Sequence, residues 1–271
     1  MSSVLALAFA LNAGGYSLLA GTPVKVGAVV DAKQRVSMDQ IDHSVLDMLL
    51  KRYVDNDGMV HYREWSQRDS DLRALDGYLS ELSRAELDVK ANRQAVLAYW
   101  INAYNAVTLK GILREYPTTS IRNHTAKLLG YNIWKDLKLQ VDDREVSLDE
   151  IEHQVLRKLG EPRIHFAIVC ASISCPKLRN EAYLPTKLEE QLANNARDFF
   201  GDSGKFQFDV KAQRLGLSKI LSWFAEDFGS TRREQLEAIS SYVPEQARDL
   251  LRSEATRISY LEYDWGLNEA K

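Results

Sequence analysis

The chain has 271 residues, of which 45% are hydrophobic and 27% charged, and these proportions exclude an intrinsically disordered chain. Its formal net charge of −3 argues against a general binder of nucleic acid or of anionic membranes, since such proteins carry a basic excess. The sequence also lacks the common phosphate-loop, dinucleotide-binding, zinc-protease and serine-hydrolase motifs, and it has no repeat of fixed period.

The first 24 residues carry no charged side chain. An apolar run over residues 4–11, followed by small residues, is typical of a secretory signal peptide, although the usual basic start is missing. We therefore interpret residues 1–35 as a signal peptide or disordered leader before one domain over residues 36–271. The expected location is the periplasm or the exterior, with the cytoplasm as the alternative. The apolar run is too short for a membrane span, so no integral membrane segment is expected in the mature chain.

Apolar residues recur at helical spacing through the first half of the chain. The run Asp55–Gly58 is interpreted as a plain turn rather than a calcium loop, because no glutamate stands at its far end. The helices expected here cover residues 38–53, 71–82 and 84 to beyond 105.

The segment 94–109 has no charged side chain and predicts a core helix, one too short and too polar to span a membrane. It should end near Tyr116, because a residue before proline disfavours helical geometry. Asn102 and Asn105 stand three residues apart and share a face of this helix. We expect both amides to tie the helix to neighbouring backbone, with a direct role in a site as the alternative.

The second half of the chain mixes helical and strand patterns. The expected elements are strand and turn over 132–146, followed by a helix over 148–159 that a Ser147 capping box opens and Gly160 stops. A second capping box at Thr186 opens a helix that continues to Phe200. A hairpin over 205–217, a helix over 219–226 capped by Ser218, a helix over 231–251 and a strand or extended tail over 258–265 complete the chain. Because strict strand–helix alternation is absent, the pattern predicts an α+β fold: a single, mainly helical domain with a small mixed or antiparallel sheet.

The stretch 163–176 is the predicted centre of the protein. Residues 164–169, apolar except for His165, predict a buried strand that leads into a loop holding both cysteines. In a regular strand His165 and Cys170 lie about 16 Å apart and cannot touch. Pro176 suits the first position of a helix, which would make Cys175 its cap and stabilise a thiolate there.

Several phrases of the sequence together carry a family resemblance. They are Tyr99-Trp100-Ile101-Asn102-Ala103-Tyr104-Asn105-Ala106, Ser147-Leu148-Asp149-Glu150-Ile151-Glu152-His153, Arg163-Ile164-His165-Phe166-Ala167 with Cys170 and Ser174-Cys175-Pro176, Ser218-Lys219-Ile220 with Trp223 and Asp227-Phe228, and Tyr263-Asp264-Trp265-Gly266-Leu267-Asn268. From about residue 40 to 268 the chain resembles the bacterial and plant family called domain of unknown function 547. The resemblance implies no settled activity, substrate or catalytic residue. Some members look fused to a glutaredoxin-type domain, which points to thiol chemistry by association.

The leading hypothesis is a cysteine-dependent hydrolase or acyl transferase that acts on a peptide or amide bond of a peptide or protein substrate. Cys175 would attack, His165 would be the base, and Asn102 or Asn105 would hold the oxyanion or the imidazole. The alternative catalytic residues are Cys170, His153, Glu152 and Asp227, and the expected binding residues are Trp100, Tyr104, Arg179 and Trp223. Such a constellation is similar to that of papain and transglutaminase enzymes, whose local signatures are absent from this chain.

Two other functions stay open at this stage. The domain could be a non-catalytic binding or scaffold module, or a thiol redox protein in which Cys170 and Cys175 form a reversible disulfide. A zinc site made of both cysteines with His153 and His165 would have unusual spacing. No metal and no cofactor are therefore expected, and no nucleic-acid partner.

Overall fold

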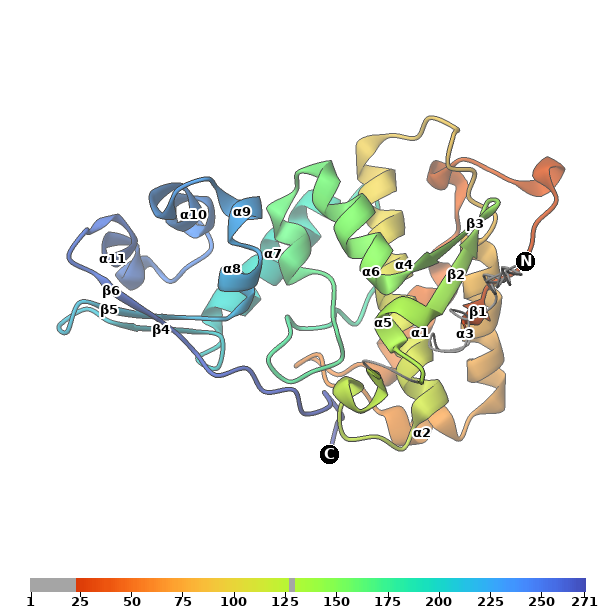
Figure 1. Ribbon diagram of the computed structural model, residues 1–271, viewed down its shortest axis with the longest axis horizontal. Coiled ribbons are helices and arrows are strands. Elements are labelled where there is room, and N and C mark those ends of the chain that lie inside the picture. The colour runs from red at the N-terminus through yellow and green to blue at the C-terminus, as the bar shows by residue number, and fades with distance from the viewer. Residues whose placement is uncertain (1–22, 127–129) are drawn as a thin grey trace, which may run out of the picture.

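The computed structural model describes residues 23–126 and 130–271. Buried side chains form two hydrophobic clusters, one within residues 26–192 together with Leu267, and one within residues 196–251 together with Phe166. We call the first part, residues 23–192, the main lobe and the second, residues 196–260, the small lobe; they lie side by side in Figure 1. Helices combine with two small three-stranded sheets in the described ranges, so the predicted α+β class is confirmed.

Helix α4 (Arg93–Glu115) runs through the centre of the main lobe and is buried on nearly every side, as predicted. It begins later than expected because the side chain of Asn92 caps the Ala95 N–H, and it ends at Glu115 with Tyr116 as its C-cap, as predicted. The helices around it are η1 (Ala32–Gln34), η2 (Met38–Gln40), α1 (Ser44–Tyr53), α2 (Tyr62–Ser66), α3 (Asp69–Leu82), η3 (Ile121–His124) and α5 (Ile133–Asp136).

The sheet of the main lobe has the order β1 (Val24–Val26), β2 (Leu137–Val141), β3 (Arg144–Ser147). Strand β1 pairs parallel with β2, and β2 pairs antiparallel with β3. Since β1 lies within the predicted leader, the folded part begins before residue 36. Residues 1–22 lie outside the described residues, and a signal peptide there stays a prediction.

The predicted helix over 148–159 is present as three segments, α6 (Leu148–Glu150), the π-helical η4 (Ile151–Leu156) and the 3₁₀ turn η5 (Arg157–Leu159). The Ser147 capping box is confirmed, and Gly160 ends the helix with a left-handed φ of 64°. The π-helical turn was not predicted. Such turns are rare and occur often at functional sites.

The predicted central strand is wrong. Residues Pro162–Phe166 form a 3₁₀ helix, η6, which Pro162 and the Glu161 side chain start. The segment lies between the lobes: Ile164 packs in the main cluster and Phe166 in the small one, so it is apolar on all sides and has no strand periodicity. No helix begins at Pro176, and the Cys175 N–H instead donates to the Ser172 carbonyl and closes a turn.

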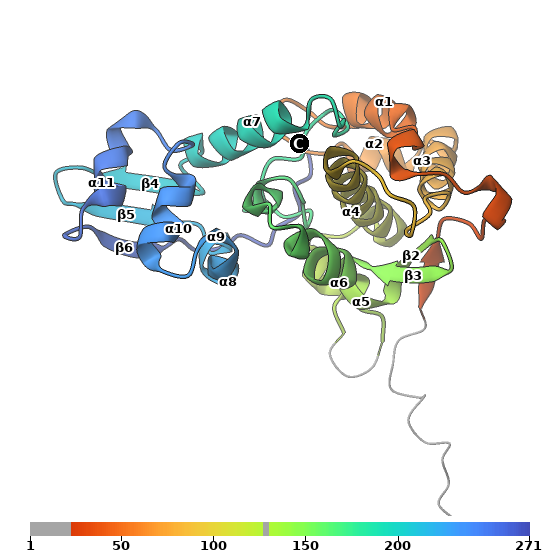
Figure 2. The ribbon, with the colours of Figure 1, turned by 90° about the horizontal axis from the view of Figure 1, so that it is seen from above.

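Helix α7 (Leu188–Gly201) leads from the main lobe into the small lobe, as Figure 2 shows. The predicted capping box at Thr186 is wrong, since Lys187 occupies the cap position without a side-chain hydrogen bond. The predicted hairpin is confirmed and belongs to the second sheet, in the order β4 (Phe206–Asp209), β5 (Arg214–Leu217), β6 (Arg257–Tyr260).

The helices of the small lobe are α8 (Ile220–Trp223), α9 (Ala225–Phe228), α10 (Arg232–Ile239), η7 (Glu245–Ala247) and α11 (Arg248–Arg252). The predicted helix over 231–251 is therefore broken. Pro244, which lacks an amide hydrogen, stands between its two halves.

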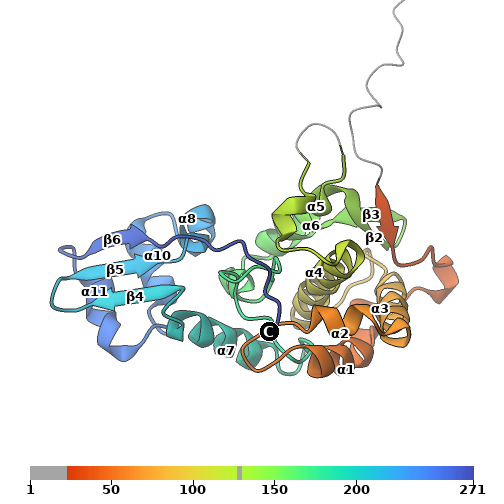
Figure 3. The ribbon, with the colours of Figure 1, turned by 90° about the horizontal axis from the view of Figure 1, so that it is seen from below.

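After β6 the chain returns to the main lobe as an extended strap, residues 261–268, which Figure 3 shows running back toward α2. Its carbonyls at Asp264 and Gly266 accept from the Ser174 and Ile173 N–H groups, and its Asn268 N–H donates to Ala171. The strap therefore holds the cysteine loop in place. Within the two described ranges, no helix has the length and apolarity that a bilayer crossing requires.

Candidate functional site

A cavity of about 270 Å³ opens where the lobes and the strap meet. The main lobe contributes Glu152, Cys170 and Cys175 to its wall, the small lobe contributes Trp223, and the strap contributes Tyr263. Pockets at such junctions are common places for ligand sites, and this one combines apolar walls with a few titratable groups.

The sulfur of Cys175 accepts two hydrogen bonds. The Cys170 N–H donates to Sγ at 3.0 Å and the Tyr263 hydroxyl at 3.2 Å. Burial opposes the charged form, but the hydrogen bonds from the Cys170 thiol, Tyr263 and Ser172 outweigh it and lower the pKa of Cys175 to about 6. The predicted thiolate is therefore favoured by these donors rather than by a helix N-terminus.

The second thiol shares the same partners. Cys170 Sγ lies 3.1 Å from the Ser172 hydroxyl and 3.4 Å from the Tyr263 hydroxyl. Its hydrogen bond to the Cys175 sulfur, together with burial, raises the pKa of Cys170 well above its usual value. Both cysteines are free, so the pair consists of one activated sulfur and one proton donor.

The turn between the two cysteines has an unusual backbone. Ala171 adopts a φ of +57°, a left-handed conformation that side chains with a Cβ rarely take. This residue directly follows Cys170, whose N–H points at the Cys175 sulfur. Residues held in such conformations cluster at functional sites.

A carboxyl group shares the cavity with the thiols. Glu152 lies on the π-helical turn η4, and the Tyr104 hydroxyl donates to its Oε2 at 3.1 Å. Burial, assisted by the negative charge at Cys175, raises the pKa of Glu152 to about 7. A carboxyl that titrates near neutrality can both donate and accept a proton.

His165 is paired with Asp227 and not with a cysteine. Its Nε2 lies 2.7 Å from Asp227 Oδ2, and its ring stacks on Phe224 at 4.1 Å between centroids. Burial lowers the pKa of His165 to about 4, so the ring is neutral near pH 7. Arg157 binds both oxygens of Asp227, which links the two lobes and keeps the pKa of Asp227 low against the effect of burial.

His153 belongs to this chain of contacts rather than to the thiols. Its Nδ1 lies 3.2 Å from an Arg157 nitrogen, and its Nε2 lies 3.9 Å from Asp149. Among the residues with described positions, no hydrogen bond joins a histidine to Cys175. The predicted pair of Cys175 with His165 or His153 is therefore not formed in this structure.

The predicted asparagines serve the fold. Asn102 exchanges two hydrogen bonds with the backbone of Tyr183, at 2.8 and 2.9 Å. Asn105 donates to the Ala167 carbonyl and accepts from the Val169 N–H, at 3.0 and 2.9 Å. Neither amide lines the cavity, so the expectation that both tie the helix to backbone is met, and neither is placed to hold an oxyanion.

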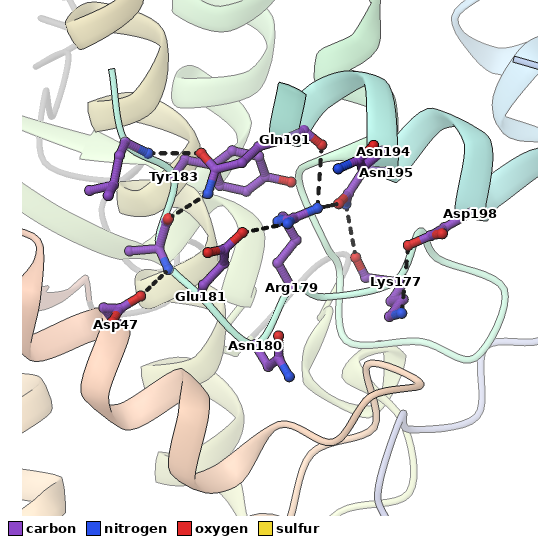
Figure 4. A network of polar contacts seen from close by, with 12 residues as sticks. Asp47, Lys177, Arg179, Asn180, Glu181, Tyr183, Gln191, Asn194, Asn195 and Asp198 are labelled. Atoms are coloured by element: carbon purple, nitrogen blue, oxygen red, sulfur yellow. Dashed lines mark hydrogen bonds and ion pairs between the residues drawn. The ribbon is translucent and has the colours of Figure 1, made fainter. Parts of the chain in front are cut away.

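The predicted binding residue Arg179 lies in a separate polar network, shown in Figure 4. Its guanidinium donates to Asn195 Oδ1 at 2.8 Å and pairs with Glu181, while Asn195 donates to the Phe166 and Lys177 carbonyls. Arg179 thus makes structural contacts outside the cavity, and its expected binding role stays a prediction.

The aromatic predictions divide. Tyr104 and Trp223 line the cavity, whereas Trp100 is buried in the core, edge-on to Tyr99 at 5.0 Å. Sequence reasoning missed Tyr263 and the other aromatic lining residues, which are Trp134, Phe224 and Trp265. The sequence does place aromatic residues at Tyr263 and Trp265, two positions apart near the end of the chain. It does not show that they lie against the cysteine loop.

Metal binding can be examined over the same described ranges. They contain no group of three or more His, Cys, Asp or Glu side chains arranged to hold a metal ion.

Comparison with known proteins gives one match. Residues 89–200 match the model of the family described as protein of unknown function, DUF547, which supports the resemblance seen in the sequence. No curated protein and no solved structure matches the chain. The matched range holds Glu152 and both cysteines but excludes Trp223 and Tyr263.

Proposed function

We propose that this protein, whose residues 89–200 match the DUF547 family model, is a cysteine-dependent hydrolase or acyl transferase acting on a peptide or amide bond. Cys175 is the nucleophile and Glu152 the acid–base group. One observation carries the proposal: the Cys175 sulfur is held by two donors in the wall of a cavity that also contains the Glu152 carboxyl.

The reaction proceeds in two balanced steps. The Cys175 thiolate attacks the substrate carbonyl, forming a carbon–sulfur bond, and the carbon–nitrogen bond then breaks as the leaving amine takes the proton of Glu152. Water or another acceptor next attacks the thioester and gives its proton to the Glu152 carboxylate. The carbon–sulfur bond breaks, and both groups return to their starting states.

Glu152 replaces the histidine of the sequence hypothesis for two reasons. His165 spends its Nε2 on Asp227 and stacks on Phe224, so its ring is engaged by the fold. Within the described ranges, Glu152 has a single hydrogen bond to its carboxyl, from Tyr104, and it titrates near neutrality. Glu152 is therefore better placed than His165 to exchange a proton with the substrate.

The pH dependence of the reaction follows from these two groups. Activity rises as Cys175 ionises, since its hydrogen bonds lower its pKa, and falls as Glu152 loses its proton, since burial raises its pKa. The rate therefore passes through a maximum as the pH increases. His165, with a pKa of about 4, stays neutral near pH 7. A rate profile measured from pH 4 to 9 with a p-nitroanilide, whose leaving amine takes a proton, checks the shape, and a rate that climbs steadily to pH 9 contradicts it.

Variants test the roles of the two residues. We expect Cys175→Ser to lose iodoacetamide labelling at this position and all turnover, and Glu152→Gln to lower kcat by about 10²–10⁴ while labelling persists. Glu190→Gln, at an exposed carboxyl of α7 outside the cavity, is the matched control and retains turnover. Full hydrolysis by Cys175→Ser, or a thiol that stays unreactive at every pH below 8, would reject the enzyme and favour a binding or scaffold domain.

A second function is favoured by the shared hydroxyl of Tyr263, which lies within 3.2 and 3.4 Å of the two sulfurs. Sulfurs so close could join as a disulfide, with a small-molecule or protein disulfide as the oxidant that takes up both electrons and both protons. Counting free thiols in glutathione redox buffers tests this reading. Two thiols at every ratio of reduced to oxidised glutathione would exclude it.

A further inference from the structure

One side of the cavity is an aromatic wall built from three parts of the chain. Trp223 comes from the small lobe, Tyr263 and Trp265 from the strap, and Trp134 from the main lobe. Their rings are in mutual contact, with centroids 4.8 Å apart for Trp223 and Tyr263, 4.5 Å for Tyr263 and Trp265, and 6.3 Å for Trp134 and Trp265. Trp223 is 47% exposed, which leaves much of its ring free for a ligand.

The inner part of the cavity holds two acidic groups, the Cys175 thiol and the Glu152 carboxyl, among apolar walls that include Ile168, Ile220 and Phe224. Arg157, nearby, is neutralised by Asp227, and His165 is a neutral ring. A negatively charged ligand group placed here would lose its water without gaining a partner of opposite charge, which is strongly unfavourable.

The other polar lining residues lie toward solvent. The Lys135 side chain is exposed, and the Asp149 and His153 side chains are 45% and 36% exposed. The cavity therefore has an apolar interior and a polar rim. Its volume of about 270 Å³ lies just below the range of small-molecule pockets, roughly 300–1,000 Å³, so it suits one substituent rather than a whole molecule.

We propose that this cavity selects substrates whose acyl part is a flat aromatic group without negative charge. The acyl group lies against the aromatic wall, its carbonyl meets Cys175, and the polar remainder of the substrate extends past the rim. This inference rests on the proposed function and names its substrate class. The juxtaposition that carries it is an exposed tryptophan face and an activated sulfur within one cavity.

Three alkylating reagents test the selectivity without requiring turnover. N-phenyl iodoacetamide, iodoacetamide and iodoacetate differ in the group attached beside the reactive carbon, and each rate at Cys175 is divided by the rate with free glutathione. We expect the phenyl reagent to react about 10-fold faster than iodoacetamide, because ring stacking is favourable, and the anionic reagent to react more slowly than both. Equal ratios, or a preference for iodoacetate, would overturn the inference.

Variants locate the effect on the wall. Trp223→Ala reduces the preference for the phenyl reagent to about that of glutathione, and Trp223→Phe restores part of it. Phe208→Ala is the matched control, since Phe208 is 38% exposed on β4 and does not line the cavity. An unchanged preference in Trp223→Ala, with circular dichroism showing a folded protein, contradicts the proposed wall.

The two proposals fail in different ways. An unreactive Cys175 removes the catalytic function, and the selectivity with it. A reactive Cys175 that supports hydrolysis but treats the three reagents alike removes only the substrate class. Ester hydrolysis gives the same separation, by comparing p-nitrophenyl phenylacetate with the mono-p-nitrophenyl ester of succinate.

Discussion

The buried amides of the main lobe and the thiols of the cavity are both polar groups taken out of water, yet their partners differ. Asn102 and Asn105 each pair an amide nitrogen and an amide oxygen with main-chain groups. The Cys175 sulfur instead shares a tyrosine hydroxyl with a second thiol. Amides that pair with backbone fix the fold and have nothing to titrate, whereas clustered titratable groups can exchange a proton.

The amide side of this comparison predicts the largest change. Asn102→Ala leaves the N–H and the carbonyl of Tyr183 without partners, and each such loss costs about 1–3 kcal/mol. We expect the free energy of unfolding to fall by roughly 2–5 kcal/mol in urea titrations, while the pH midpoint of Cys175 alkylation stays in place. Asn123→Ala, at an exposed amide, is the control. A shifted pH midpoint of Cys175 alkylation with an unchanged free energy of unfolding would show that Asn102 acts on the thiol rather than on the fold.

The thiol side predicts a smaller energy and a change in reactivity. Tyr263→Phe removes a donor to the Cys175 sulfur but keeps the aromatic ring. The pKa of Cys175 should rise by about one unit, which is about 1.4 kcal/mol and lowers the alkylation rate at pH 6 by roughly 5- to 10-fold. Stopped-flow alkylation from pH 5 to 9 measures it. Tyr260→Phe is the tyrosine control, and equal midpoints in both variants would remove Tyr263 from the site.

The smallest effect concerns the backbone between the two cysteines. Ala171→Gly relieves the left-handed strain at φ +57° but adds freedom to the unfolded chain, and these contributions nearly cancel. We expect a change in unfolding free energy within about 1 kcal/mol, with Cys175 reactivity retained. Ala171→Val should be worse than glycine at the same position. If glycine and valine lower the free energy of unfolding equally, the left-handed φ of residue 171 does not determine the stability of this turn.

Local patterns in the sequence were sufficient for much of the fold. The core helix, the Ser147 capping box and the hairpin depend on neighbouring residues, and all three are present. The stretch 164–169 misled because burial on all sides removes the periodicity that separates strand from helix. The sequence predicted a Cys175 thiolate stabilised by the N-terminus of a helix starting at Pro176, and the structure has no helix there.

The candidate site was harder to predict because its partners are far apart along the chain. Tyr263 follows Cys175 by 88 residues, and Asp227 follows His165 by 62. Spacing of that length carries no information on contact without a fold. Arg179 was predicted to bind a ligand because its charge lies near Cys175 in the sequence. Its guanidinium instead donates to Asn195, which lies 16 residues further along the chain.

The strap also sets an order of events during synthesis. The ribosome adds Cys175 well before Tyr263, because 88 residues, including those of the small lobe, separate the two. While the chain is still being synthesised, the Cys175 sulfur therefore lacks the Tyr263 hydroxyl as a donor, and its pKa is higher than in the finished protein. The unfinished chain is accordingly less open to alkylation or oxidation at this sulfur.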